Sequence, residues 1–172
     1  MLLASLQGLP ENCPHGDSMY SIPIYKIRLL RDGNQKVPSK NVSSPEVVAE
    51  ILSLYLKGQD REHLIAIMLD ARKKVIGINT VSIGSLTAAI VHPREVFKAA
   101  ILSNAHSIII GHNHPSGDPT PSQEDITVTS ELVRAGKLLK IPVIDHVIIG
   151  DDGRFTSLAN EGIIPDDETV YG

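Results

Sequence analysis

The strongest constraint on the fold is a set of short apolar runs that alternate with helix-like segments. Apolar runs over residues 63–69, 107–110 and 141–149 are typical of strands that are buried on both faces. Helix signals occupy residues 93–101 and 120–139, between these runs. Strands that alternate with helices predict an α/β fold built in layers around a sheet.

Capping patterns predict where two helices begin. Ser43 and Glu46 have the spacing of a capping box, which predicts a helix that runs to about Leu56. Thr120 is the expected N-cap of a longer helix, with Gln123 as its capping-box partner. Both helices should therefore start at a defined residue.

The remaining signals divide the chain into three parts. We expect an N-terminal extension over residues 1–41, with one strand at residues 22–30. A single domain should cover residues 42–160, in which residues 74–83 form a hairpin with the first apolar run. Residues 161–172 are expected to be an acidic C-terminal tail.

Composition excludes several classes of protein. The only cysteine is Cys13, so neither an internal disulfide nor a thiolate cluster is possible. No apolar run approaches the ~20 residues of a membrane span, and the first residues lack a basic leader, so we expect a cytoplasmic protein. The formal net charge of -4 argues against non-specific coating of nucleic acid. Residues 26–40, with five bases against one acid, keep a nucleic-acid contact open.

Side chains that bind metals follow the apolar run at residues 107–110. His112 and His114 are two residues apart at the end of that expected strand, so its pleat should point both imidazoles to one face. Asp125 lies early in the next helix, and Ser122 precedes it by three residues on the same helix face. A helix packed beside its preceding strand can bring this carboxylate and hydroxyl to the two imidazoles.

Two imidazoles and a carboxylate suit a borderline-soft divalent ion, and three protein ligands leave a fourth position for water, as in catalytic zinc sites. Such a water needs a base, and a histidine that binds the metal cannot serve. Glu62, directly before the apolar run at residues 63–69, is the best candidate. Glu95 competes for this role, but a first-turn helix acid is explained more simply by the helix dipole.

The spacing of these residues resembles the JAMM motif of the JAB1/MPN metallopeptidases. His112-x-His114 is followed by seven residues, Ser122, two residues and Asp125, and an upstream glutamate completes that motif. Three segments resemble the RadC branch of the family: His92–Glu95, His112–Asp118 and Asp145–His146. The resemblance covers roughly residues 42–160.

The resemblance implies a cytidine-deaminase-like fold, with a mixed β-sheet sandwiched by helices, and zinc-dependent hydrolysis of a peptide or isopeptide bond. It assigns one zinc ion per chain to His112, His114 and Asp125. It assigns the acid/base role to Glu62 and a hydrogen bond to the developing oxyanion to Ser122. Longer relatives of this type have a helix-hairpin-helix module, so the chain resembles a short form, and the RadC name carries a link to DNA repair.

Two rival functions remain to be weighed. A nucleotide deaminase would need a pair of zinc-binding cysteines, and this chain has a single cysteine. The second rival is a DNA-repair-associated or protein-interaction module with a structural or vestigial metal, against which the presence of both Glu62 and Ser122 counts. For Asp145 and His146, support of the site and an ordinary structural role are equally open.

Overall fold

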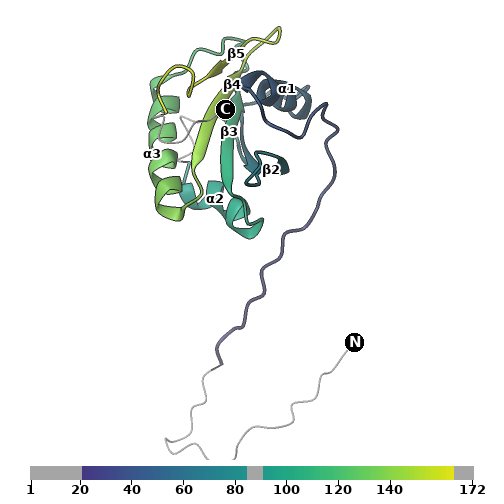
Figure 1. The fold of residues 1–172 in the computed structure, drawn as a ribbon, viewed down its shortest axis with the longest axis vertical. Coiled ribbons are helices and arrows are strands. Elements are labelled where there is room, and N and C mark those ends of the chain that lie inside the picture. Colours follow the sequence, from purple (N-terminus) through teal and green to yellow (C-terminus); the bar gives the residue numbers. More distant parts are fainter. Residues whose placement is uncertain (1–20, 85–90, 165–172) are drawn as a thin grey trace, which may run out of the picture.

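The computed structural model describes residues 21–84 and 91–164 and contains a five-stranded sheet with helices on both faces (Figure 1). The sheet order is β2-β1-β3-β4-β5. Only β3 and β4 pair in parallel; the other neighbours are antiparallel. The elements are, in chain order, α1 (Pro45–Tyr55), β1 (His63–Leu69), β2 (Val75–Ile83), α2 (Pro93–Leu102), β3 (Ser107–Asn113), α3 (Gln123–Leu139), β4 (Val143–Ile149) and β5 (Phe155–Ser157). This confirms the predicted α/β fold with a mixed sheet between helices.

Helices cover the two faces of the sheet unequally. In Figure 1, α1 lies on one face and α2 and α3 lie on the other. On β1, Ile65 and Ile67 pack into the core layer that contains Leu52 of α1, whereas Leu64 and Ala66 pack into the layer of α2 and α3. The strand reads as a continuous apolar run because both of its faces are buried.

Both predicted capping boxes are wrong in detail. The N-cap of α1 is Ser44 instead of Ser43, and its side chain makes no capping hydrogen bond. Helix α3 begins after Ser122, whose hydroxyl accepts a hydrogen bond from the backbone N–H of Asp125. Thr120 instead donates its hydroxyl and its backbone N–H to Asp118 in the preceding loop. The shift of two residues places Asp125 in the first turn of α3.

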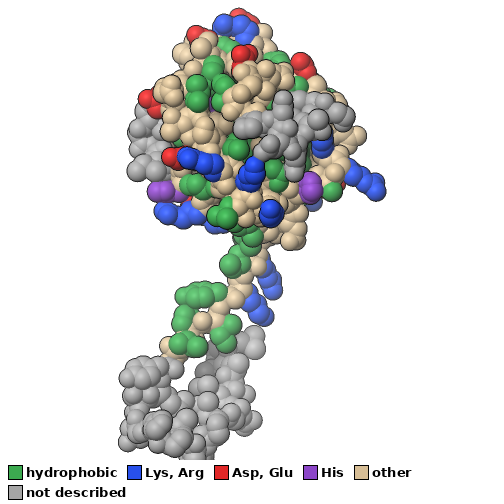
Figure 2. All heavy atoms as spheres, turned by 60° about the vertical axis from the view of Figure 1, so that its left-hand side comes forward, with side chains coloured by type: hydrophobic (Ala, Val, Ile, Leu, Met, Phe, Trp, Pro, Cys, Tyr) green, Lys and Arg blue, Asp and Glu red, His purple; other side chains and the backbone are tan. Residues whose placement is uncertain are grey.

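The strand expected over residues 22–30 is not formed. These residues run as an arm away from the folded body (Figure 1), and their large apolar side chains are exposed. Figure 2 shows the apolar and basic side chains of the arm beyond the surface of the domain. Within the described residues the lead-in meets the sheet as a bridge between Asn41 and Lys74, so no neighbouring strand stabilises the arm. The expected acidic tail lies mostly outside the described residues.

Among residues 21–84 and 91–164, no helix combines the length and the apolar character needed to cross a bilayer.

Candidate metal centre

The central strand β3 places two histidines at and just beyond its C-terminal end. His112 is paired on both sides, with Leu64 of β1 and Ile148 of β4, and the backbone N–H of His114 still donates to Ile149. The extended chain therefore continues past the end of β3, and both imidazoles lie on the same face, as their spacing predicts. Their ring centroids are 4.7 Å apart, and the two Nε2 atoms are 2.9 Å apart.

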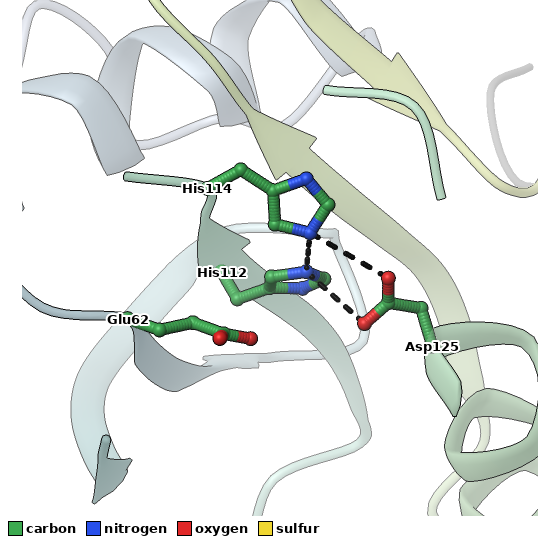
Figure 3. A group of neighbouring side chains, drawn as sticks. All are labelled: Glu62, His112, His114 and Asp125. Atoms are coloured by element: carbon green, nitrogen blue, oxygen red, sulfur yellow. Dashed lines mark hydrogen bonds and ion pairs between the residues drawn. The ribbon is translucent and has the colours of Figure 1, made fainter. Parts of the chain in front are cut away.

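Asp125 reaches the two imidazoles from the first turn of α3 (Figure 3). Its Oδ1 lies 3.2 Å from Nε2 of His112, and its Oδ2 lies 3.5 Å from Nε2 of His114. Oδ2 also accepts hydrogen bonds from the hydroxyl and the backbone N–H of Ser122. Burial on its own would raise the pKa of Asp125, but its pairing with the imidazoles of His112 and His114 holds it well below its usual range.

Glu62 enters the same group from the loop before β1. In Figure 3 its carboxylate points toward His112. One ligand atom each from Glu62, His112, His114 and Asp125 lies within 4.8 Å of the others. The structure therefore brings the four residues together that the motif singles out, from three separate parts of the chain.

Asn113 holds the loop of Glu62 in place, a role that the sequence did not reveal. Its Oδ1 accepts the backbone N–H of His63, and its Nδ2 donates to the carbonyl of Arg61, both at 2.9 Å. The two hydrogen bonds hold the backbone on either side of Glu62. Asn113 lies between the two histidines and points to the other face of β3, so one strand end carries the imidazoles and the clamp for the glutamate.

The protonation of His114 is set by its surroundings. Its Nδ1 is 2.7 Å from the carbonyl oxygen of Asp118, which can only accept, so Nδ1 carries a proton and Nε2 presents a lone pair to the cluster. The carboxylate of Asp125 beside Nε2 raises the pKa of His114 against the opposing effect of burial. The raised pKa of His114 and the lowered pKa of Asp125 both arise from the pairing of this carboxylate with the imidazoles.

The donor set fits a zinc ion. Zinc binds imidazole nitrogens and carboxylate oxygens at about 2.0–2.2 Å, and tetrahedral geometry then places neighbouring donors roughly 3.3 Å apart. The donor separations of 2.9, 3.2 and 3.5 Å among His112, His114 and Asp125 bracket that value. Two nitrogens and one oxygen are also the ligand types of catalytic zinc sites.

Three other residues considered from the sequence have defined partners. Glu95 forms ion pairs with Arg94 and Lys98 on the surface of α2 and is not part of the cluster. Asp145 accepts hydrogen bonds from the backbone of His146 and Ala159 and from the hydroxyl of Ser157, so it fastens β4 to the segment around β5. His146 contacts His112 directly.

A surface hollow of about 390 Å³ borders the site on the side of His114. Its volume lies at the low end of the range of small-molecule pockets. Asn113 and His114 line it together with the turn of residues 150–153 and residues 58–60 after α1. A bound molecule in the hollow would therefore lie beside both the cluster and the clamp of Glu62.

The sheet and the residues clustered at the end of β3 define a class of protein: a JAB-type α/β fold with a cluster able to hold a metal ion. The chain belongs to the RadC-like JAB domain family, whose pattern matches residues 42–163. Three similar proteins share the name UPF0758 protein. That of Caldanaerobacter subterraneus subsp. tengcongensis is 57% identical over 122 residues, which are 71% of this chain and 52% of the relative.

The other two of these relatives have slightly lower identities to this chain. The UPF0758 protein of Methanosarcina mazei is 50% identical over 127 residues, covering 74% of this chain and 55% of its own length. That of Desulforamulus reducens is 49% identical over 123 residues, covering 72% and 54%. The chain thus spans about half the length of the curated relatives it matches.

Proposed function

We propose that this chain is a zinc-dependent hydrolase that cleaves a peptide or isopeptide bond. The observation that carries the proposal is the convergence of Glu62, His112, His114 and Asp125 within 4.8 Å at one edge of the sheet. Two members of the group, His112 and Asp125, are buried, and a buried carboxylate is costly without a cation beside it. Membership of the RadC-like JAB domain family supports the same assignment.

His112, His114 and Asp125 are the proposed ligands of one zinc ion per chain. When bound, zinc supplies a Lewis acid that polarises a carbonyl oxygen and lowers the pKa of a water in the open fourth position. Asp125 keeps its orientation because Ser122 donates two hydrogen bonds to Oδ2. Burial of His112 and Asp125 limits competition from bulk water at the site.

Glu62 is the proposed general acid/base. Its carboxylate accepts a proton from the attacking water and then delivers it to the leaving nitrogen, which departs as a neutral amine. This shuttle needs a carboxylate close to the ligands and outside the set of three that bind the metal. Asn113 provides the fixed position by holding the backbone of Arg61 and His63.

Ser122 is the proposed donor to the oxyanion that develops on the attacked carbonyl. In the structure its hydroxyl proton is directed at Oδ2 of Asp125. The backbone N–H of Ser122 also bonds that oxygen, so Asp125 keeps one partner when the hydroxyl rotates toward a substrate. One donor of this kind is worth roughly 10²–10³ in turnover.

The metal assignment is tested by zinc content. We expect about one zinc per chain in purified wild-type protein, because the cluster supplies one set of three ligands. His114→Ala should lose the metal, and elemental analysis of both proteins measures it. Equal zinc content in the two would remove His114 from the site.

The hydrolase assignment is tested by Glu62→Gln. Glutamine keeps the shape of the side chain and cannot accept the proton, so zinc content should stay near wild type while turnover falls at least ~10²-fold. Turnover is measured on a panel of peptide and isopeptide substrates, with Glu95→Gln as the matched control on the surface of α2. Bound zinc without turnover on any substrate would favour the interaction module, and loss of turnover in Glu95→Gln alone would move the acid/base to Glu95.

A further inference from the structure

His146 lies directly behind His112, on the side away from the ligand cluster. Its Nε2 is 2.7 Å from Nδ1 of His112, and its Nδ1 is 2.6 Å from the hydroxyl oxygen of Thr129 in α3. The side chains of His112, Thr129 and His146 are all buried, at no more than 1% exposure. Water therefore does not complete their hydrogen bonds, so each bond between these side chains needs one donor and one acceptor.

Thr129 determines which atom donates and which accepts in each of these hydrogen bonds. Its hydroxyl has one proton, and the oxygen also lies 2.6 Å from the backbone carbonyl of Asp125, which can only accept. The hydroxyl therefore donates to Asp125, and Nδ1–H of His146 donates to the hydroxyl oxygen. A buried imidazole with one proton on Nδ1 presents a bare Nε2 to its other neighbour.

This assignment of donors and acceptors also determines the tautomer of His112. Because Nε2 of His146 is an acceptor, Nδ1 of His112 must carry the proton, and Nε2 of His112 is left with its lone pair. That Nε2 is the atom that faces Asp125 and His114 in the candidate metal centre. The chain of hydrogen bonds begins at one proposed ligand and ends on the backbone of another.

We propose that His146 and Thr129 are positioning residues for the candidate metal centre, holding His112 in the tautomer whose Nε2 can bind a metal. The inference rests on the proposed zinc site and adds two residues that prepare it. Histidines that bind metals normally donate their second N–H to a carboxylate, a carbonyl or water. Here the acceptor is another imidazole, which can accept only while Thr129 takes the proton on its far side.

Thr129→Val is the sharpest variant, because it keeps the shape of the side chain, and the hydroxyl that it removes bonds only His146 and the backbone of Asp125 in the described residues. Without an acceptor at Nδ1, His146 can carry its proton on Nε2 and no longer accepts from His112. Zinc affinity should fall ~10–100-fold, the usual effect of removing such a partner. Thr129→Ser restores the hydroxyl and should restore the affinity.

Variants at His146 separate its two nitrogens. His146→Gln places an amide oxygen near the position of Nε2 and should keep much of the zinc affinity, whereas His146→Leu should lose it. The matched control is Val147→Ala on the same strand, because Val147 is equally buried and packs in the layer on the opposite face. It should lower the thermal midpoint without changing zinc affinity.

Zinc affinity is measured on the full chain by competition with a chromophoric chelator, beside the thermal midpoint of the metal-free protein. ¹⁵N-histidine spectra of the metal-free protein report the tautomer directly: wild type should show His112 protonated on Nδ1, and Thr129→Val should show a mixture. Affinities that simply follow the thermal midpoints, or equal affinity in wild type and Thr129→Val, would overturn the inference alone. Wild-type protein without zinc affinity would overturn the proposed metal site together with it.

Discussion

Ser122 serves two demands with one hydroxyl group. As N-cap of α3 it accepts the backbone N–H of Asp125 at 3.1 Å, and as a donor it bonds the carboxylate of the same residue at 2.6 Å. The proposed role toward a substrate would replace only the second of these bonds. The cap and the catalytic contribution can therefore be separated by experiment.

Ser122→Ala should lower the free energy of unfolding by about 1 kcal/mol, the usual cost of a lost N-cap. If Ser122 also stabilises the oxyanion, turnover should fall roughly 10²–10³-fold. Chemical denaturation and steady-state kinetics on the same preparation measure the two effects. Unchanged turnover beside the stability loss would leave Ser122 with a capping role only.

Asn113 differs from Ser122, because we expect it to affect a reacting group, Glu62, only through the backbone. Asn113→Ala removes both hydrogen bonds that grip the loop of Glu62, so we expect turnover to fall roughly 10–10²-fold through misplacement of the carboxylate. Zinc content should stay near wild type because no proposed ligand is changed. Asn160→Ala, an exposed asparagine after β5, is the control. Loss of zinc in Asn113→Ala would show that the clamp acts on the histidines instead.

At the scale of elements, β3 and α1 meet at a position that leaves no room for a side chain. A Cβ on Gly111 would overlap the methyl groups of Leu52, which is fully buried in α1. Gly111 directly precedes His112, so the closeness of α1 to the sheet is set one residue away from a proposed ligand. Packing of this helix and the position of the candidate metal centre are thereby linked.

Gly111→Ala should destabilise the protein by about 1–3 kcal/mol, the usual cost of overpacking a core. Leu52→Ala should cost less in the Gly111→Ala background than in wild type, because it vacates the overlapping space. Denaturant unfolding of the four proteins in this cycle measures the coupling. Gly33→Ala, with open space around its Cβ, should be nearly neutral. Additive effects of Gly111→Ala and Leu52→Ala would contradict the predicted overlap.

The elements that could be predicted from the sequence are those with strong local signals. The buried strands, the β1–β2 hairpin and the three helices were predicted because apolar runs and prolines mark them. The start of α3 was misplaced by two residues because Thr120 and Ser122 are both good N-caps, and only the loop around Asp118 decides between them. The arm at residues 22–30 has the pattern of a strand, but a strand also needs a neighbour.

The four clustered residues could be predicted because their spacing is a motif. Their supports could not. Asn113 bonds residues about 50 positions earlier in the chain, and His146 bonds His112 from a separate strand. Such contacts depend on the strand register and on the crossover through α3, and no local sequence pattern predicts either of them.

On the scale of the whole molecule, the arm is separate from the core. Ile24 and Ile27 are 92% and 73% exposed, whereas Val42, where the chain joins the sheet, is 3% exposed. The core should therefore not depend on the side chains of the arm, although their apolar and basic character makes them available to another molecule.

Replacing both Ile24 and Ile27 by serine should change the free energy of unfolding by less than ~0.5 kcal/mol, as is usual for exposed positions. Val42→Ser should instead be clearly destabilising, because it places an unpaired hydroxyl in the core. Thermal and denaturant unfolding compare the two variants with wild type. A large loss in the Ile24/Ile27 variant would mean that the arm packs on the domain or on a second copy of the chain.

The parallel pairing of β3 with β4 affects the order in which the molecule can be completed. Helix α3 lies between β3 and β4 in the chain, so the pairing of these two strands closes a longer loop than a hairpin and should be among the slower contacts to form. During synthesis, a chain that has emerged as far as residue 139 already contains Glu62 and all three proposed zinc ligands, but it still lacks His146. Because His146 joins the site only when β4 docks, we expect zinc to be bound at full affinity late in folding, so that tightly bound zinc marks chains whose sheet is finished.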